Sequence, residues 1–275
     1  MSRNIDVKGK ESFLAIIGRM FRVKYINGVH EVMSTNNIIS VRNITKNYKG
    51  RKALDDISFD IQRQEIFGLI GPNGAGKSTF ISLLATINRP DAGDILVEGK
   101  SILHNAESIR KRLGYVPQEI ALYPMLTANE NLNFWGGIYS VHPTLKKQRI
   151  EQVLHLLKLY DRRNDKVRTF SGGMKRRLNI AASLLHEPEI LIMDEPTAGV
   201  DVLSRATIAE LILGLKKQGR TIIITSHYID ELELLCDRIG VLRNGSLLYS
   251  GSIDDVLKTT ANDNLEQLML KLEEA

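Results

Sequence analysis

The stretch that decides the fold is residues 71–79, which read GPNGAGKST. It matches the pattern G-x-x-x-x-G-K-[ST] and lies between a strand-like apolar run, EIFGLI (65–70), and a helix-like segment, KSTFISLLATI (77–87). Glycines in such a loop let successive backbone N–H groups face phosphate oxygens, and the following helix adds its positive N-terminal end. The pattern therefore predicts an α/β fold that binds a nucleotide through this phosphate loop.

The phosphate loop supplies both ligands and charge. We expect Lys77 to neutralise the β- and γ-phosphates and Ser78 to coordinate Mg²⁺. The candidate nucleotide contacts from the loop are Gly71, Pro72, Asn73, Gly74, Ala75, Gly76, Lys77, Ser78 and Thr79.

A second apolar run, ILIMDE (190–195), ends in two carboxylates. Asp194 is predicted to lie at the C-terminal end of a core strand, beside the loop, where it can hold Mg²⁺ through water. Glu195 follows at the strand end and is the candidate general base for an attacking water. A solvated acidic pair would explain these two residues alone, but not their occurrence with a complete phosphate loop.

The segment FSGGMKRRL (170–178) predicts another glycine-containing turn that opens a helix. The Ser171 hydroxyl, the N–H groups of Gly172 and Gly173, and the helix N-terminus would together accept an anion. A simple helix cap is the alternative. We call these three residues the Ser171 turn.

The motifs GPNGAGKST, SGGMKRR, ILIMDEPTAGVD and ITSH, in this order, resemble the ATP-binding subunit of an ABC transporter over residues 38–250. The resemblance implies a P-loop (RecA-like) α/β core with a parallel sheet, an antiparallel β subdomain and a helical subdomain. It also implies that the Ser171 turn binds the γ-phosphate of ATP held by a second subunit, in a head-to-tail pair.

Further positions match the family one at a time. Tyr48 resembles the aromatic residue that stacks on adenine, although alone it would be an ordinary surface tyrosine. Gln118 in YVPQ resembles the glutamine that senses Mg²⁺ and water, and His227 resembles the histidine that contacts the γ-phosphate. Asp201 in AGVD resembles the aspartate that crosses the dimer seam.

Two departures from the commonest family pattern concern the subfamily. Met174 stands where the signature usually has Gln, and residues 198–200 read Ala-Gly-Val instead of Ser-Ala-Leu. Together with KRRL, these residues resemble the branch that serves ABC-2 type exporters, which move drugs, lipids, polysaccharides or ions.

The resemblance, together with the hydrophobic pattern, divides the chain into an N-terminal extension (1–37), an ATPase domain (38–250, with a helical subdomain at about 119–170) and a C-terminal helical tail (251–275). Alternation in ISFDIQ (57–62) predicts an antiparallel strand, and Asn244-Gly245 predicts a tight hairpin. The basic residues 1–32 fit an amphipathic membrane-surface helix, a disordered tail, or translated sequence upstream of Met33.

Composition excludes several classes. The chain has 275 residues, 43% of them hydrophobic and 25% charged, which is ordinary for a globular protein. No apolar run is long enough to span a membrane, no signal peptide is expected, and a single cysteine rules out an internal disulfide. The net charge of +5 is spread along the chain, so we expect no nucleic-acid partner.

The sequence thus predicts an ATP- and Mg²⁺-dependent ATPase that drives export through separate transmembrane subunits at the cytoplasmic face of the membrane. We expect a homodimer, and an apolar groove near Tyr123, Met125 and Trp135 for the membrane partner; core packing of Trp135 is the alternative. Two competing functions remain: an ABC-type ATPase acting on ribosomes or nucleic acid, and a nucleotide-binding module that does not hydrolyse ATP.

Overall fold

The computed structural model describes residues 24–26, 29–31 and 36–274. The chain divides into two compact units, residues 1–37 and 38–275. In the first unit, β1 (Lys24–Ile26) and β2 (Val29–Glu31) form an antiparallel pair. Most of residues 1–32 lie outside the described residues, so the three interpretations of this segment stay open, except that residues 24–26 are a strand and not part of a helix.

The larger unit is built around a six-stranded sheet in the order β12-β11-β5-β10-β9-β8. All neighbouring pairs are parallel except β11 and β12, which form a hairpin. Asn244 and Gly245 connect these two strands with φ angles of 48° and 83°, as the hairpin prediction requires. The strands are β5 (Ile66–Ile70), β8 (Leu113–Val116), β9 (Ile190–Asp194), β10 (Thr221–Thr225), β11 (Arg238–Arg243) and β12 (Ser246–Ser252).

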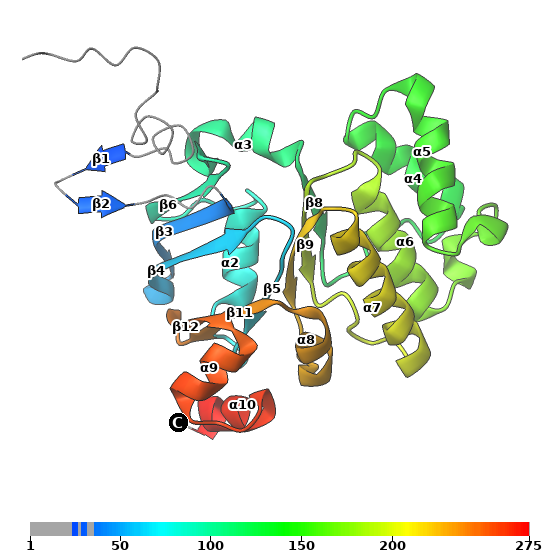
Figure 1. Ribbon diagram of the computed structural model, residues 1–275. Helices are drawn as coiled ribbons and strands as arrows, with labels where there is room; N and C mark the ends of the chain where they lie inside the picture. Colours follow the sequence, from blue (N-terminus) through cyan, green and yellow to red (C-terminus); the bar gives the residue numbers. More distant parts are fainter. Residues whose placement is uncertain (1–23, 27–28, 32–35, 275) are drawn as a thin grey trace, which may run out of the picture. The chain divides into compact units, whose positions relative to one another are not determined.

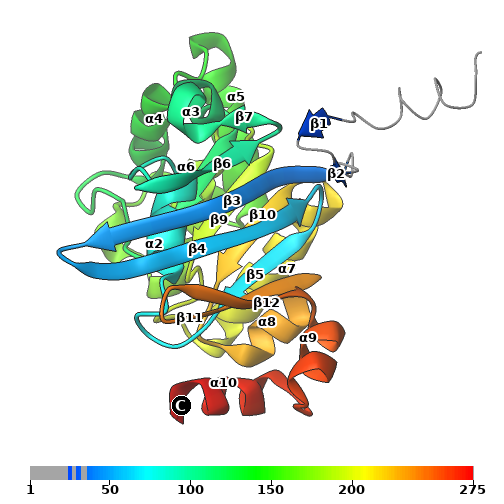
Figure 2. The ribbon, with the colours of Figure 1, turned by 90° about the vertical axis from the view of Figure 1, so that its left-hand side faces the viewer.

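A second, four-stranded sheet has the order β4-β3-β6-β7. Figure 2 shows β3 and β4 side by side as a long hairpin. The predicted alternation holds, because Ile57, Phe59 and Ile61 are buried while Ser58 is exposed. The strands are β3 (Asn37–Tyr48), β4 (Arg51–Gln62), β6 (Ala92–Val97) and β7 (Lys100–Ser101).

The helices α6, α7 and α8 cover the parallel sheet on the face opposite the second sheet, whereas α2 lies on the same face as the second sheet (Figure 1). The described helices are α2 (Lys77–Leu84), α3 (Ile102–Arg110), α4 (Ala128–Ile138), α5 (Pro143–Leu156), α6 (Gly172–Leu184), α7 (Val202–Lys217), α8 (Ile229–Leu235), α9 (Ile253–Thr260) and α10 (Leu265–Glu274), with 3-10 turns η1 (Tyr160–Arg162) and η2 (Val167–Thr169). Leu265, Leu268 and Leu272 bury one side of α10 in the same core as Leu232 and Leu235 of α8.

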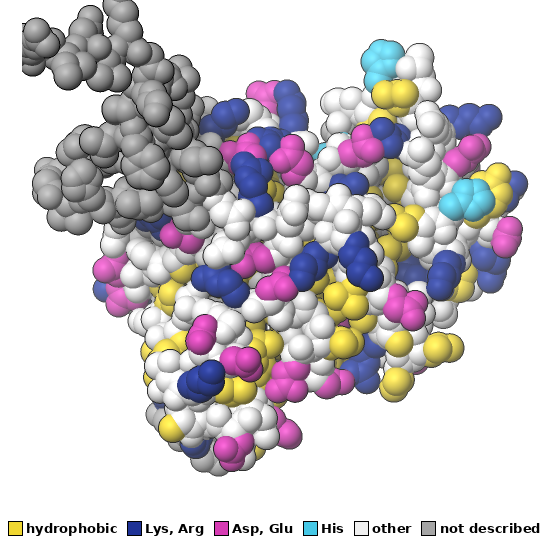
Figure 3. Space-filling model, viewed as in Figure 1, with side chains coloured by type: hydrophobic (Ala, Val, Ile, Leu, Met, Phe, Trp, Pro, Cys, Tyr) yellow, Lys and Arg dark blue, Asp and Glu magenta, His cyan; other side chains and the backbone are white. Residues whose placement is uncertain are grey.

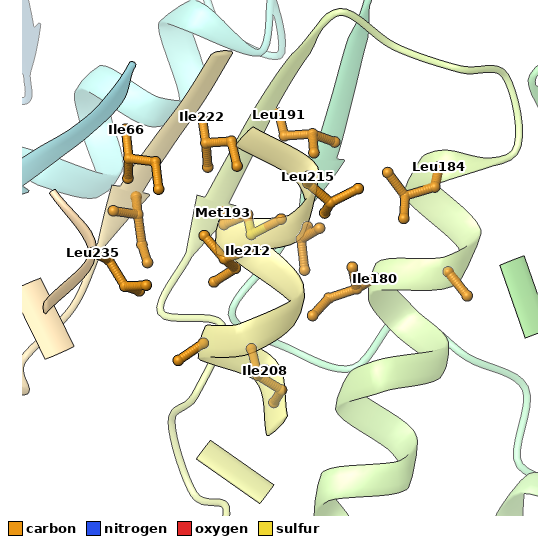
Figure 4. Close-up of a cluster of buried hydrophobic side chains, with 14 of the residues drawn as sticks. Ile66, Ile180, Leu184, Leu191, Met193, Ile208, Ile212, Leu215, Ile222 and Leu235 are labelled. Carbon is orange, nitrogen blue, oxygen red and sulfur yellow. The ribbon is translucent and has the colours of Figure 1, made fainter. Parts of the chain in front are cut away.

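The central strands are apolar on both faces, as their continuous hydrophobic runs predict. Leu191 and Met193 of β9 pack with Ile222 of β10 against α6, α7 and α8 (Figure 4). Ile190 and Ile192 of the same strand face the other way, into the core that holds α2 and the second sheet. The sheet is therefore a rigid layer, and its C-terminal edge presents the segments that follow β5, β9 and β10.

Candidate active site

The phosphate loop joins β5 to α2 and is shaped by contacts that exclude side chains. Gly76 caps α2 with a φ of 111°, and a Cβ there would lie 2.5 Å from the carbonyl oxygen of Ala53. Only glycine tolerates both the backbone angle and this close approach. A backbone without Cβ atoms at the start of a helix is the cradle that a phosphate requires, so this loop fits a nucleotide.

Lys77, the first residue of α2, is buried, with 7% of its surface exposed. Its Nζ donates to the carbonyl oxygens of Gly71 at 2.6 Å and Pro72 at 3.1 Å. Burial lowers the pKa of Lys77, and the negative charges of Glu195 and Asp194 oppose that shift. A buried ammonium group bonded to neutral oxygens is well placed to gain from an incoming phosphate.

A cavity of about 450 Å³ adjoins the loop and unites residues that are far apart in sequence. Of the predicted residues, Tyr48, Gln118, Glu195 and His227 line it together with loop residues. The full lining is Tyr48, Arg51, Ala53, Asn73, Gly74, Gly76, Lys77, Ser78, Thr79, Gln118, Glu195 and His227.

Glu195 contacts two other polar side chains that line the cavity. Its carboxylate accepts a hydrogen bond from Nε2 of Gln118 at 2.9 Å and lies 2.5 Å from Nε2 of His227. Its backbone has a φ of 49°, a left-handed angle that costs free energy in a residue other than glycine. Two 3.1 Å hydrogen bonds from its N–H, to the carbonyl and hydroxyl oxygens of Thr225, hold this conformation.

The turn after β9 separates the two adjacent carboxylates. Asp194 is buried and accepts a 2.6 Å hydrogen bond from the Thr225 hydroxyl, whereas Glu195 lines the cavity. Thr225 therefore fixes both acidic residues, one through its side chain and the other through its hydroxyl and carbonyl oxygens. The sequence reasoning missed Thr225; its place at the end of the strand TIIIT was the available signal.

The Ser171 turn lies at the start of α6, outside the phosphate cavity. The Ser171 hydroxyl accepts a 3.2 Å hydrogen bond from the N–H of Met174, and both Ser171 and Gly172 are exposed. Gly173 is buried against Ser204 of α7, where a Cβ would lie 2.1 Å from the Ser204 hydroxyl oxygen.

Asp201 lies close by, because its carboxylate accepts hydrogen bonds from the backbone and hydroxyl of Ser204 at 2.9 and 2.8 Å. The backbone bond, followed by the hydroxyl bond, lowers the pKa of Asp201. The Ser171 turn and Asp201 both contact Ser204, and Ser171, Gly172 and Asp201 are exposed. The described lining of the phosphate cavity includes none of these residues, so one chain does not bring the turn to its own loop.

Two further residues were missed. Arg51, in the same hairpin as Tyr48, lines the cavity and donates to the carbonyl oxygen of Gly74 at 3.4 Å. Glu231 of α8 is buried and accepts hydrogen bonds from the hydroxyls of Thr197 at 2.8 Å and Ser226 at 2.5 Å. It joins the segment after Glu195 to the segment before His227. Neither residue lies in a recognisable sequence motif.

The burial of Glu231 gives a prediction about pH. Burial raises its pKa above the ordinary 4.5, and the bonds from Ser226 and Thr197 oppose the shift. Its protonated form is favoured on folding, so the stability it contributes is complete below the unfolded pKa and is lost as pH rises through the folded pKa. Glu231→Gln cannot ionise. In urea unfolding, its free energy of unfolding relative to the parent chain is expected to rise as the pH increases above about 5, where the unfolded carboxyl ionises. A difference that does not change with pH would contradict this.

Comparison with known proteins identifies the family. The family model described as ABC transporter matches residues 54–198. The chain belongs to the ABC transporter family. It is 46% identical over 231 residues to the linearmycin resistance ATP-binding protein LnrL of Bacillus subtilis (strain 168), covering 84% of this chain and 74% of LnrL. It is 36% identical to the daunorubicin resistance ATP-binding protein DrrA3 of Streptomyces coeruleorubidus, covering 84% and 73%.

Among solved structures, the chain resembles the dimeric post-hydrolysis state of the ATP-binding cassette MJ0796 bound to ADP and Pi, with a TM-score of 0.70 and 26% identity over 78% of this chain and 98% of that one. The predicted family, the P-loop α/β fold and the ATPase activity are confirmed. In the part of the chain that the structure describes, no helix is both long and apolar enough to cross a membrane.

Proposed function

We propose that this ABC ATPase hydrolyses ATP at the cavity beside the phosphate loop, with Glu195 as general base. The observation that carries the proposal is the convergence of Gln118 and His227 on the Glu195 carboxylate, in the same cavity as Lys77. The carboxylate accepts a proton from the attacking water, and His227 and Gln118 hold it in position. A nucleotide-binding module without hydrolysis would not need this arrangement.

The remaining contacts with ATP and Mg²⁺ are assigned from where each side chain lies in or beside the cavity. Tyr48 stands 44% exposed at the cavity and offers its ring to adenine, while the backbone of residues 71–79 and Lys77 bind the phosphates. Ser78, Asp194 and Gln118 would hold Mg²⁺. Their hydroxyl, carboxylate and amide oxygens are the hard donors that this ion prefers, and the bound ion would neutralise phosphate charge.

The Ser171 turn and Asp201 are assigned to the nucleotide of a second subunit. Support comes from the exposure of Ser171, Gly172 and Asp201, and from the absence of the turn and Asp201 from the described lining of the chain's own phosphate cavity. A two-fold, head-to-tail pair satisfies both surfaces at once, because each copy gives its loop to one nucleotide and its turn to the other. We propose a homodimer closed by two ATP molecules.

The transported class is proposed from the relatives. LnrL and DrrA3 are named as ATP-binding proteins of linearmycin and daunorubicin resistance. We propose that this chain likewise powers ABC-2 type export of a drug, lipid, polysaccharide or ion, with a drug favoured by these names, as a peripheral subunit at the cytoplasmic face of the membrane. Residues 38–250 would act as the ATPase domain, with 119–170 as its helical subdomain, 1–37 as an extension and 251–275 as a tail.

A nucleic-acid or ribosomal partner is not favoured. Figure 3 shows Lys and Arg side chains interspersed with Asp and Glu over the drawn face of the larger unit, whereas nucleic-acid binding needs a continuous basic surface. Recovery of the native protein with membranes is expected; recovery only with ribosomes or DNA would contradict the transport proposal.

The membrane subunit is proposed to dock in a groove of about 750 Å³ between α3, α4 and α5. Leu113, Ile138 and Leu145 supply apolar surface. The charged lining is mixed, with Arg110, Lys111 and Arg149 beside Glu107 and Glu187. Trp135 packs as its alternative predicts, because the indole Nε1 donates to the carbonyl oxygen of Ala121 at 3.0 Å and the ring lies on the core. Tyr123 and Met125 are exposed but do not line the groove.

Introducing a negative charge into this groove tests whether the membrane subunit docks there. Ile138 is 59% exposed, so Ile138→Glu is expected to leave folding intact but to abolish co-purification with the membrane subunit and the ATPase stimulation it causes. Leu234→Glu, at an equally exposed position (64%) on α8, is the control and is expected to bind normally. Equal loss of binding in both variants would remove the groove from the proposal.

A further inference from the structure

The first turns of α6 carry a buried arginine that the proposed mechanism does not use. Arg176 lies five residues after Ser171, about 7 Å along the helix axis, and only 4% of it is exposed. Its guanidinium donates to the carbonyl oxygens of Pro117 at 3.0 Å, Gln118 at 2.8 Å and Ala198 at 3.4 Å. One side chain therefore links α6 to two segments of the active site.

Each of the two linked segments donates a hydrogen bond to Glu195, the proposed general base. The side chain of Gln118 donates to the Glu195 carboxylate at 2.9 Å, and the N–H of Ala198 donates to the Glu195 carbonyl at 3.1 Å. Arg176 thus holds the two segments whose own hydrogen bonds fix Glu195. The N-terminus of the same helix is the Ser171 turn.

Packing alone does not account for an arginine at this position. Burial lowers the pKa of Arg176, and the charges of Glu195 and Asp194 oppose the shift. In the described part of the chain, no carboxylate forms an ion pair with it. A buried charge without an ion-pair partner is costly, and an apolar side chain would fill the space at lower cost. What the guanidinium adds is a planar fork that fixes several carbonyl oxygens at once.

We infer that Arg176 is a positioning residue that couples the two nucleotide sites of the dimer. When the Ser171 turn takes up the partner's nucleotide, α6 shifts as a rigid element, and Arg176 passes the shift to Gln118 and Ala198 and so to Glu195. ATP bound at one site thereby sets the base at the other. The inference rests on the proposed function, in which the turn and the base of one chain serve different nucleotides.

The test compares two neighbouring arginines of α6. Arg177 is also partly buried, burial also lowers its pKa, and it donates to the carbonyl oxygen of Leu157 at 2.8 Å, away from the active site. Arg177→Gln is therefore the matched control for Arg176→Gln. ATP turnover against ATP concentration is measured for the full chain, alone and assembled with its membrane subunit, and thermal melts confirm folding.

The parent chain and Arg177→Gln are expected to show a Hill coefficient well above 1, toward the limit of about 2 for two sites. Arg176→Gln is expected to lower it to about 1 and to reduce kcat ~10–100-fold with little change in KM. Arg176→Lys keeps the positive charge but lacks the planar guanidinium, and it is expected to recover part of kcat. If Arg176→Gln does not fold, the Hill coefficient of Arg176→Lys is compared with that of the parent chain instead. A parent Hill coefficient of 1, or equal coefficients in the parent chain and both Arg176 variants, would overturn the inference.

Failure of the inference is separable from failure of the proposed function. In a Glu195→Gln background, Arg176→Gln is expected still to form ATP-trapped dimers, because the Ser171 turn is intact. If Glu195→Gln alone does not dimerise with ATP, the ATP-bridged dimer of the proposed function fails, whatever the Hill coefficients are. If Glu195→Gln dimerises with and without Arg176→Gln, and the Hill coefficient of Arg176→Gln with intact Glu195 equals that of the parent chain, only the role of Arg176 fails.

Discussion

Glu195→Gln is expected to lower ATP turnover by ~10²–10⁴-fold, the usual contribution of a general base. The amide can still accept a hydrogen bond from Gln118, but it cannot take a proton from water. ATP binding and closure do not require that proton transfer. The variant is therefore expected to accumulate as an ATP-bound dimer, seen as a doubling of mass in size-exclusion chromatography with light scattering.

Glu210→Gln, an exposed carboxylate on α7, is the control and is expected to turn over ATP like the parent chain. Unchanged turnover in Glu195→Gln would remove Glu195 from its role as base. A variant that loses turnover but stays monomeric with ATP, with and without its membrane subunit, would leave the base in place and remove the ATP-bridged dimer.

Gly172→Asp is expected to abolish ATP-dependent dimerisation while leaving the monomer folded. Gly172 is the exposed first residue of α6, and a Cβ there meets its nearest neighbour, the carbonyl oxygen of Gly199, at an ordinary 3.6 Å. A carboxylate at a helix N-terminus stabilises the helix, so the melting temperature is not expected to fall. The same carboxylate would face the partner's γ-phosphate, where like charges cost several kcal/mol, or ~10²-fold or more in affinity.

Gly172→Asn distinguishes the effect of the negative charge in Gly172→Asp from the effect of side-chain size. Its side chain has nearly the same size as that of Asp but no charge, so it is expected to retain most of the ATP-trapped dimer in a Glu195→Gln background. Equal dimer yields from the Asp and Asn variants would contradict an anion at this position. Loss of the melting transition in Gly172→Asp would instead indicate a role in folding.

Local patterns predicted the elements that carry the fold. The loop before α2, the apolar runs of β5, β9 and β10, and Asn244-Gly245 are each specified by neighbouring residues. They formed as expected because a buried parallel strand and a tight hairpin have strong local signals. The residues that line the cavity were predicted for a different reason, since Tyr48, Gln118 and His227 came from the family resemblance.

What the sequence could not supply depends on contacts between distant segments. Thr225 fixes Asp194 from a neighbouring strand, and Gly173 requires glycine because Ser204 of another helix lies against it. Arg176 meets three carbonyl oxygens that only the folded chain assembles. Whether Trp135 would pack on the core was open from the sequence, because its packing depends on the carbonyl oxygen of Ala121, fourteen residues away.

The central claim is that the phosphate loop of one copy and the Ser171 turn of another complete one site. The most direct test mixes two inactive chains, Lys77→Ala and Gly172→Asp, each in a Glu195→Gln background, and counts trapped ATP per dimer. A mixed dimer contains one site with intact Lys77 and intact Gly172, so about one ATP per mixed dimer is expected, against none for either chain alone. No trapped ATP in the mixture, or trapping by either chain alone, would contradict the account.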